Sequence, residues 1–513
     1  IHNAKIYTVN DAFDVQEAMV IKDGIIVDIG PQNEILNKYT AKEVVDAGKK
    51  PIYPGFIDAH CHFVGYAQNL NEVNLVGTSS FEEVVERVSA FAQTNQSEWI
   101  VGRGWDQNDW EVKEFPTKEK LDSVFPDTPV AIRRIDGHAL LANQAAIDLA
   151  GVTIETPFSG GEIVKKNDKL TGIFIDNPMS LIEAKIPKPS RTEAAAALKE
   201  AEAICFSYGL TTVDDAGLSP NTIELIDSLQ KNGDLKIRIY AMVSGNLKNI
   251  NYYLQRGISE TDRLHVCSFK LYADGALGSR GAALRKPYSD HPGHYGAMIT
   301  PLDSLQYYAK RIADSDFQMN THAIGDSANH FLLKTYEDAL SGKKNKRWRI
   351  EHAQVISPED FKYFKDIIPS VQPTHATSDM YWAEDRLGPE RIKGAYAYQE
   401  LLDNYGLVAL GTDFPVEQVS PFLTFYAAVA RKDLNNYPEN GFQPENGLSR
   451  EETLKGMTIW AAYANFEENE KGSIEPGKMA DFIILDRDIM TVPIEEVPNI
   501  QVLETYVGGE KVK

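Results

Sequence analysis

The chain has 513 residues and 43% of them are hydrophobic, so it can bury a large core and is long enough for more than one domain. No apolar run approaches the roughly 20 residues that a membrane-spanning helix needs, so we expect no membrane span. Acidic residues outnumber basic ones by 74 to 52, and the resulting net charge of −22 gives no indication of a nucleic-acid partner.

The two ends of the chain both alternate short apolar runs with turn signals. The runs lie at 3–9, 18–22 and 25–29 near the start, and at 481–486 and 500–507 near the end. Two or three strands bury too little surface to be stable on their own. We therefore expect residues 1–50 and 470–513 to combine into one small β-sandwich.

The sequence begins at Ile1 rather than Met, within what reads as a strand. We expect residues upstream of it, either a short segment or an export signal. A cytoplasmic protein is favoured, and an exported form is left open as the alternative.

Between the two ends, eight apolar and β-branched runs alternate with helical patterns. The runs lie at 54–62, 210–217, 236–245, 266–274, 318–325, 347–355, 367–376 and 406–415. Helical patterns at 191–208, 220–231, 302–314, 358–365 and 451–464 separate several of them. Strands that alternate with helices form parallel sheets, and eight such units close into a (β/α)8 barrel. We assign residues 51–62 and 191–469 to this barrel.

Residues 63–190 separate the first barrel strand from the second and are far too long for a loop. They contain helical patterns at 80–94 and 144–150 and strand patterns at 99–104 and 130–135. We therefore expect an inserted α+β domain at the mouth of the barrel.

Side chains able to bind metal occur at the ends of five predicted strands. His60 and His62 end the first strand, where side chains two residues apart point the same way. The remaining members follow on strands four, five, six and eight: Lys270, His322, His352 and Asp413. Because the carboxyl ends of all barrel strands meet at one mouth, these residues predict a metal site.

The sequence words around these residues are distinctive as a set. They are Gly-Phe-Ile-Asp-Ala-His60-Cys-His62, Lys270-Leu-Tyr-Ala-Asp-Gly, Thr-His322-Ala-Ile-Gly-Asp, Ile-Glu-His352-Ala-Gln and Gly-Thr-Asp413-Phe-Pro. This pattern resembles the amidohydrolase superfamily, and within it the N-substituted formamide deformylase-like, YtcJ-type proteins. The resemblance spans nearly the whole chain, and it implies a metal-dependent hydrolase and the same composite β-sandwich.

The ligand types bear on which metal is bound. Histidine and carboxylate ligands without cysteine suit a catalytic Zn²⁺ site, with Mn²⁺, Fe²⁺ or Co²⁺ as alternatives. Lys270 joins the site only if its neutral amine reacts with CO2 to give an anionic carbamate, which the resemblance implies. Two ions are then expected, one held by His60, His62 and Asp413, and the other by His322 and His352. The alternative is an ordinary ammonium paired with Asp274 or another acid, with one ion bound.

The predicted chemistry is hydrolysis of a C–N bond in an amide, N-acyl or N-formyl compound by metal-bound hydroxide. Asp413 is expected to act first as a general base and then as a general acid. A neighbouring donor, His138 or the metal, would stabilise the tetrahedral oxyanion. The predicted catalytic residues are therefore Asp413, His352 and His138.

Six further residues are candidates for substrate contact. Four of them lie at or just past strand ends, namely Asp274, Arg280, Gln372 and His375, and two lie in the insert, Trp105 and Asp106. Each has a structural alternative: Trp105 as a core residue, Arg280 as part of a salt bridge, and Gln372 as a hydrogen-bonding residue in the barrel.

Two other functions remain in competition with C–N hydrolysis. The same barrel could hydrolyse a lactone or a phosphotriester, or it could bind metal and ligand without turnover. A non-catalytic binder has no need of a general base, so Asp413 argues against it. The expected partner is a small-molecule substrate, and a homodimer is left open.

Overall fold

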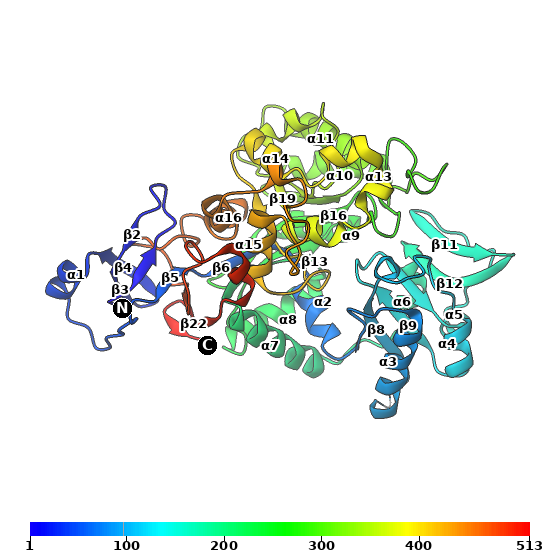
Figure 1. Cartoon of the computed structure of the whole chain (residues 1–513), viewed down its shortest axis with the longest axis horizontal. Helices are drawn as coiled ribbons and strands as arrows, with labels where there is room; N and C mark the ends of the chain where they lie inside the picture. Colours follow the sequence, from blue (N-terminus) through cyan, green and yellow to red (C-terminus); the bar gives the residue numbers. More distant parts are fainter. Residues whose placement is uncertain (96) are drawn as a thin grey trace.

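A computed structural model describes residues 1–95 and 97–513 of the chain. Its centre is a nearly closed barrel of eight parallel strands (Figure 1). In spatial order these are β6 (Phe56–Cys61), β13 (Leu210–Leu218), β14 (Arg238–Ser244), β16 (Leu264–Tyr272), β17 (Gln318–Ala323), β18 (Arg349–His352), β19 (Ile368–Val371) and β20 (Ala409–Leu410). The predicted barrel is confirmed.

The barrel closes where its two edge strands, β20 and β6, meet. The backbone N–H of Asp413 donates to the His60 carbonyl at 2.8 Å, and that of His62 donates to the Phe414 carbonyl at 2.8 Å. The Thr412 hydroxyl donates to the Asp58 carboxylate at 2.6 Å across the same seam. The seam therefore fixes His60, His62 and Asp413 relative to one another.

Helices cover the barrel because their apolar faces need burial. They include α7 (Arg191–Ser207), α8 (Pro220–Lys231), α9 (Leu247–Arg256), α10 (Leu302–Ala313), α11 (Asp326–Leu340) and α14 (Tyr398–Tyr405). Ser190 caps α7 through a capping box with Glu193, and Ser219 caps α8 by accepting from the Thr222 N–H. These polar caps set where the chain turns from strand to helix.

Several predicted boundaries are wrong, each for a local reason. The apolar run at 367–376 is strand only in β19, because Pro373 starts the helix α12 (Pro373–Asp379). The pattern at 358–365 forms a 3-10 helix, η2 (Phe361–Asp366). The single helix expected at 451–464 is two, α16 (Arg450–Gly456) and α17 (Ile459–Ala464), separated by the non-helical Thr458.

Strands from both chain ends share one six-stranded sheet in the order β2-β1-β5-β21-β22-β23. Its members are β1 (Lys5–Tyr7), β2 (Val15–Gln16), β5 (Pro51–Pro54), β21 (Phe482–Leu485), β22 (Val502–Val507) and β23 (Glu510–Lys511). A hairpin of β3 (Ala18–Lys22) and β4 (Ile25–Gly30) packs into the same apolar cluster. Gly55 separates β5 from β6, and a Cβ there would lie 2.3 Å from the Thr211 hydroxyl oxygen. The chain thus passes from one sheet to the other at a point where only glycine fits.

The segment between β6 and β13 carries a second six-stranded sheet in the order β11-β12-β10-β9-β8-β7. Its strands are β7 (Val73–Asn74), β8 (Ile100–Trp105), β9 (Val130–Arg134), β10 (Ala139–Ala142), β11 (Gly161–Lys166) and β12 (Lys169–Asp176). The helices α3 (Phe81–Thr94) and α5 (Gln144–Ala150) pack on it. In Figure 1 this segment, coloured blue to cyan, stands beside the barrel on the side away from the chain-end sheet.

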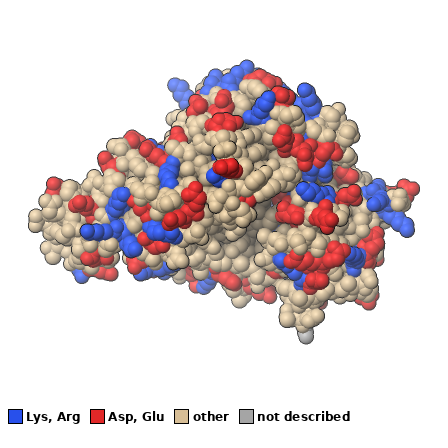
Figure 2. All heavy atoms as spheres, in the orientation of Figure 1, with Lys and Arg blue, Asp and Glu red and all other residues tan. Residues whose placement is uncertain are grey.

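Figure 2 shows acidic and basic side chains interspersed over the visible face of the molecule. Among the described residues, no helix combines the length and apolar character needed to cross a membrane.

Candidate metal centre

The predicted metal ligands converge at the carboxyl ends of the barrel strands. Five of them line one cavity of about 540 Å³: His62, Lys270, His322, His352 and Asp413. His60 lies fully buried beneath them. The opposite wall of the cavity comes from the segment between β6 and β13, which contributes Arg103, Arg134 and His138 among others.

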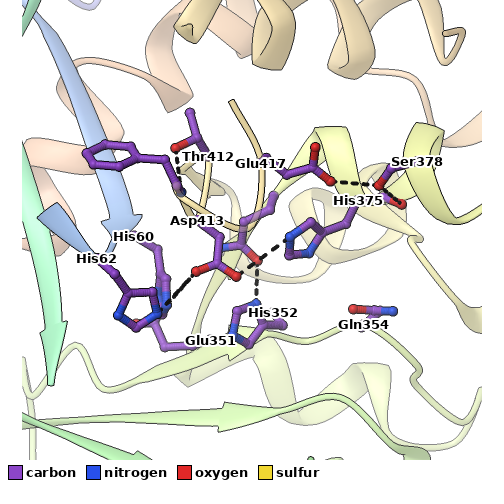
Figure 3. Close-up of polar contacts among 12 residues, drawn as sticks. His60, His62, Glu351, His352, Gln354, His375, Ser378, Thr412, Asp413 and Glu417 are labelled. Carbon is purple, nitrogen blue, oxygen red and sulfur yellow. Dashed lines mark hydrogen bonds and ion pairs between the residues drawn. The ribbon is translucent and has the colours of Figure 1, made fainter. Parts of the chain in front are cut away.

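Asp413 is the centre of this cluster (Figure 3). Its Oδ1 lies 3.3 Å from His62 Nε2 and 3.7 Å from His60 Nε2, and its Oδ2 lies 3.6 Å from His375 Nε2. Two groups of three donor atoms result, each with all atoms within 4.8 Å of one another: His60, His62 and Asp413, and His352, His375 and Asp413. The carboxylate is shared by both groups.

The donor atoms at this centre are not used up by the protein. Asp413 Oδ1 and His375 Nε2 are buried, and neither has a hydrogen-bond partner among the described residues. Buried polar atoms are nearly always satisfied, so an unsatisfied pair at one point calls for a ligand. Imidazole nitrogens and a carboxylate are the donor types that divalent transition ions bind. The residues present therefore fit a metal ion.

Two imidazoles of the cluster are oriented from behind. His60 Nδ1 lies 2.5 Å from Glu351 Oε2, and His352 Nδ1 lies 2.6 Å from Gln372 Oε1. An Nδ1–H donated to a carboxylate or amide oxygen leaves the Nε2 lone pair free to bind a metal. These contacts thus fix the tautomer that a metal ligand needs.

The protonation states also suit a cation. Burial lowers the pKa of His322 and of His352 well below its usual value, and it lowers that of His62 to about 4. Burial alone would raise the pKa of the Asp413 carboxyl, but the surrounding imidazoles of His62, His60 and His352 hold it well below its usual range. Neutral imidazole and ionised carboxylate are the forms that bind metals.

Lys270 lies at the base of the cavity with its Nζ 3.1 Å from His60 Nε2. It forms no ion pair within the described part of the chain. Asp274, its predicted partner in the alternative reading, instead accepts hydrogen bonds from the N–H groups of Ala283, Ile324 and Gly325 at 2.8 to 3.0 Å. Burial lowers the pKa of the Lys270 amine to about 8. Only a minority of the amines is therefore neutral at pH 7, and about half are neutral at pH 8.

Two residues of the cluster adopt a backbone conformation that is uncommon for L-amino acids. The φ angle is 74° at His352 and 61° at Asp413. Such conformations cost of the order of 1–3 kcal/mol and concentrate at functional sites. Positive φ at His352 also interrupts the strand alternation, which lets Glu351 and His352 serve the same centre.

His138 reaches the cavity from the turn between β9 and β10. Its Nδ1 lies 2.6 Å from Asp176 Oδ1, and its ring centroid lies 5.0 Å from that of His322. Burial would lower the pKa of His138, but the hydrogen bond and charge of Asp176 outweigh it and raise the pKa. His138 thus lies beside His322, one of the predicted metal ligands, and its catalytic role stays a prediction.

The six predicted substrate contacts divide into two groups. Asp106 and His375 line the cavity, and the Asp106 carboxylate also pairs with Arg134. Trp105 is fully buried in the core of the insert, where its indole N–H donates to the Ile132 carbonyl at 2.9 Å. Trp105 therefore lies outside the lining of the cavity, in the core position named as its structural alternative.

Three further candidates also lie outside the lining of the cavity. Arg280 pairs with Asp290 at 2.8 Å and lies outside the cavity lining, so the salt-bridge alternative holds. Asp274 is buried beneath the loop that follows β16, which it anchors through backbone N–H groups. Gln372 orients His352 from behind rather than facing the cavity.

Sequence reasoning missed several residues of the cavity wall. Arg103, Tyr272, Asp379 and Glu417 all line it, and Glu351 lies behind His60. Glu351 and Tyr272 carried a signal, since each lies within one of the sequence words around the predicted ligands. Arg103 lies on the insert, Asp379 ends α12 and Glu417 lies in a loop, and their positions depend on tertiary packing.

Comparisons with known proteins agree with this geometry. A family model described as "Amidohydrolase family" matches residues 43–513. The chain is 31% identical to Protein LONG AFTER FAR-RED 3 of Arabidopsis thaliana, over 100% of this chain and 91% of that protein. It is 29% identical to putative amidohydrolase YtcJ of Bacillus subtilis, over 99% and 98% of the two chains. It is 25% identical to N-substituted formamide deformylase of Arthrobacter pascens, over 99% and 97%.

A solved structure is similar over the same extent. The uncharacterized metal-dependent hydrolase from Pyrococcus horikoshii OT3 superposes with a TM-score of 0.79 and 28% identity, covering 96% of this chain and 98% of that one.

Proposed function

This chain belongs to the amidohydrolase family, and from that premise we propose that it is a metal-dependent hydrolase of a C–N bond in an amide or N-acyl compound. The observation that carries the proposal is the Asp413 carboxylate, which lies among three imidazoles with a buried oxygen that lacks a partner. A site built only to bind metal would use such an oxygen as a ligand. A hydrolase also needs a base beside the metal, and Asp413 can serve as both.

We propose that the predicted metal ligands divide into two sets. His60, His62 and Asp413 would hold one ion, while His322 and His352 would hold a second. Zn²⁺ suits these donors, with Mn²⁺, Fe²⁺ or Co²⁺ as substitutes. Such an ion lowers the pKa of a water molecule from about 15.7 toward 7 and polarises a carbonyl group.

Lys270 is proposed to bridge the two sets as an N6-carboxylated side chain. Its support is threefold: it lies between His60 and the cavity, it forms no ion pair within the described residues, and its amine is partly neutral near pH 8. Only a neutral amine reacts with CO2, and the resulting carbamate supplies two anionic oxygens. Without that reaction, an ammonium beside the His60 imidazole would oppose a cation.

Asp413 and His138 would share the movement of charge. Asp413 accepts the proton of the attacking water and delivers it to the leaving amine. His138, held by Asp176 and facing His322, is placed to donate to the oxygen on which negative charge develops. The segment 63–190 would therefore supply one wall of the cavity and, through His138, a catalytic residue.

The chain-end sheet has no residue in the cavity lining. We propose that residues 1–50 and 470–513, joined by β5 (Pro51–Pro54), form a composite β-domain that supports the barrel, and that the barrel consists of the rest of 51–62 with 191–469.

The function is tested by removing metal with a chelator, restoring it, and screening N-acyl amines, lactones and phosphotriesters. We expect between one and two metal equivalents per chain and hydrolysis of an N-acyl compound that is lost and regained with the metal. The variant His60→Ala should lose metal and activity together. The control His330→Ala, on α11 and paired with Asp360, should keep both. Metal content below a tenth of an equivalent without restorable activity would refute the proposal. Turnover of only lactones or phosphotriesters would show that the bond hydrolysed is not a C–N bond.

A further inference from the structure

The insert sheet carries three arginines near the cavity, and they differ in their partners. Arg133 pairs with Glu183 at 2.9 Å and lies 3.7 Å from Glu72. Arg134 pairs with both Asp106 and Asp136. Arg103 lines the cavity, yet no carboxylate of the described residues is close enough to form an ion pair with it.

Arg103 is nevertheless held in place. Its Nη2 donates to the Ile135 carbonyl at 2.9 Å, and its Nε is buried without a partner among the described residues. Gly137, at a φ of 75°, packs against it so closely that an added Cβ would lie 3.1 Å from Nη2. The guanidinium is therefore fixed at the cavity wall with hydrogen-bond donors unused.

The electrostatic surroundings leave this cation uncompensated. Burial and the like charge of Arg133 lower the pKa of Arg103, whereas Asp413 and Asp136 raise it from a distance. A guanidinium stays charged in proteins, so its burial without a partner carries a free-energy cost. Tyr272 lines the same cavity.

Two further acids of the cavity, Asp379 and Glu417, form no ion pair with Arg103. Asp379 accepts hydrogen bonds from Tyr396 at 2.7 Å and from Gln354 at 3.3 Å, and burial raises its pKa to about 7. Glu417 accepts from Ser378 at 2.6 Å, and burial raises its pKa too. Their negative charge is thus weakened and already engaged on another part of the wall.

We propose that Arg103, together with Tyr272, forms a subsite for a carboxylate of the substrate, so that the amide cleaved is an anionic one such as an N-acyl amino acid. This inference rests on the proposed function, since it names the class of amide. A guanidinium presents parallel N–H donors that match the two oxygens of a carboxylate. Substrate binding would then supply the counter-ion that the protein does not.

The test compares matched pairs of compounds on the metal-loaded protein. Each pair consists of an N-acetyl amino acid and the corresponding N-acetyl amino alcohol, which replaces the carboxylate by a neutral hydroxymethyl group. In the parent protein we expect a higher kcat/KM for the acid than for the alcohol. Arg103→Gln should lower kcat/KM for the acid about 10- to 100-fold, mainly by raising KM, because a charge-assisted contact is lost. For the alcohol, kcat/KM should change less than about twofold, because the alcohol does not make this contact. Arg103→Lys should retain part of the preference.

Arg133→Gln is the control, since it removes a neighbouring cation that is already paired. Any effect of Arg133→Gln on kcat/KM should be the same for the acid and the alcohol. A thermal unfolding curve shows whether each variant is folded. If the acid is preferred in no pair, or if Arg103→Gln lowers both members equally, the subsite is overturned.

Binding separates failure of this subsite from failure of the proposed function. Calorimetric titration of the parent and of Arg103→Gln with the same compounds needs no turnover. Binding of the acid that depends on Arg103, without hydrolysis of either compound, would support the subsite and count against amide hydrolysis. Hydrolysis of both compounds without dependence on Arg103 would do the reverse.

Discussion

The two ends of the barrel differ in whether their charged side chains have partners. At the amino ends of the strands, Arg238 binds Asp481 through two contacts of 2.5 and 2.9 Å, and Arg347 binds Glu468 through two contacts of 2.9 and 2.8 Å. At the carboxyl ends, Asp413 lies among imidazoles and keeps an oxygen without a partner. Paired charges fix the architecture, whereas unpaired ones are available for a ligand.

This contrast predicts that substitutions at the two ends change different measurements. A change at the mouth should alter catalysis or metal binding and leave folding nearly intact. A change at the base should alter folding and leave the turnover of folded molecules intact.

The largest effect is expected for Asp413→Asn at the mouth. The amide keeps an oxygen that can ligate metal weakly, but it cannot accept a proton at neutral pH. We expect kcat to fall about 10²- to 10⁴-fold, with most of the metal retained, as measured by steady-state kinetics and elemental analysis. Asp303→Asn, on the exposed first turn of α10, is the matched control. A kcat within about threefold of the parent, far less than a lost base should cost, would exclude Asp413 as the proton shuttle.

The next effect is expected for Arg238→Met at the base. The change leaves Asp481 buried without its partner, which costs about 3–5 kcal/mol of the free energy of unfolding. Denaturant titration measures the loss, while kcat per folded molecule should stay unchanged. Arg256→Met, on the surface of α9, should change stability by less than about 0.5 kcal/mol.

The same pair gives a pH dependence. Burial alone would raise the pKa of Asp481, but Arg238 holds it below its usual value, so its contribution to stability is present above the unfolded pKa and lost as pH falls. In Arg238→Met the Asp481 carboxylate is buried without its cation, so protonating it raises the free energy of unfolding of the variant. The difference between parent and variant should therefore shrink as pH falls below about 5, and a constant difference would contradict the pairing.

A smaller effect is expected for Gln372→Leu, which acts on the metal through His352. Removing the acceptor of the His352 Nδ1–H should weaken metal affinity about 10- to 100-fold, and excess metal should restore kcat. Competition with a chelator measures the affinity. Gln399→Leu on α14 serves as control. An unchanged affinity in Gln372→Leu would show that His352 holds no metal.

The smallest effect concerns the pH at which metal is taken up. With a pKa of about 8, the Lys270 amine is mostly protonated at pH 7, and about half of it is neutral at pH 8. At fixed dissolved CO2, the rate of reconstitution should rise about fivefold from pH 7 to 8 and less than twofold from 8 to 9. Lys270→Gln should lose this dependence. A parent rate that ignores both pH and CO2 would argue against carboxylation.

The sequence predicted the barrel because its strands are apolar runs that alternate with helical patterns, and it predicted the clustering because five of these runs end in a candidate metal donor. Residues such as His322 and Asp413 are therefore brought together by topology alone. Arg280 and Trp105 could not be placed in this way, because their surroundings depend on Asp290 and on packing within the insert. Arg103 was missed for the same reason, since an unpaired cation is visible only once its neighbours are known. The roles of the clustered residues stay predictions.

The order of the chain-end sheet has a consequence for synthesis on the ribosome. Ile52 in β5 pairs with Ile484 in β21, so about 430 residues are made between the two partners. At about 5–20 residues per second, β5 waits roughly 20 to 90 s for its neighbour. During that interval one edge of an apolar strand stays unpaired, and such edges invite pairing with other chains. The nascent protein should therefore depend on chaperones until its last strands emerge.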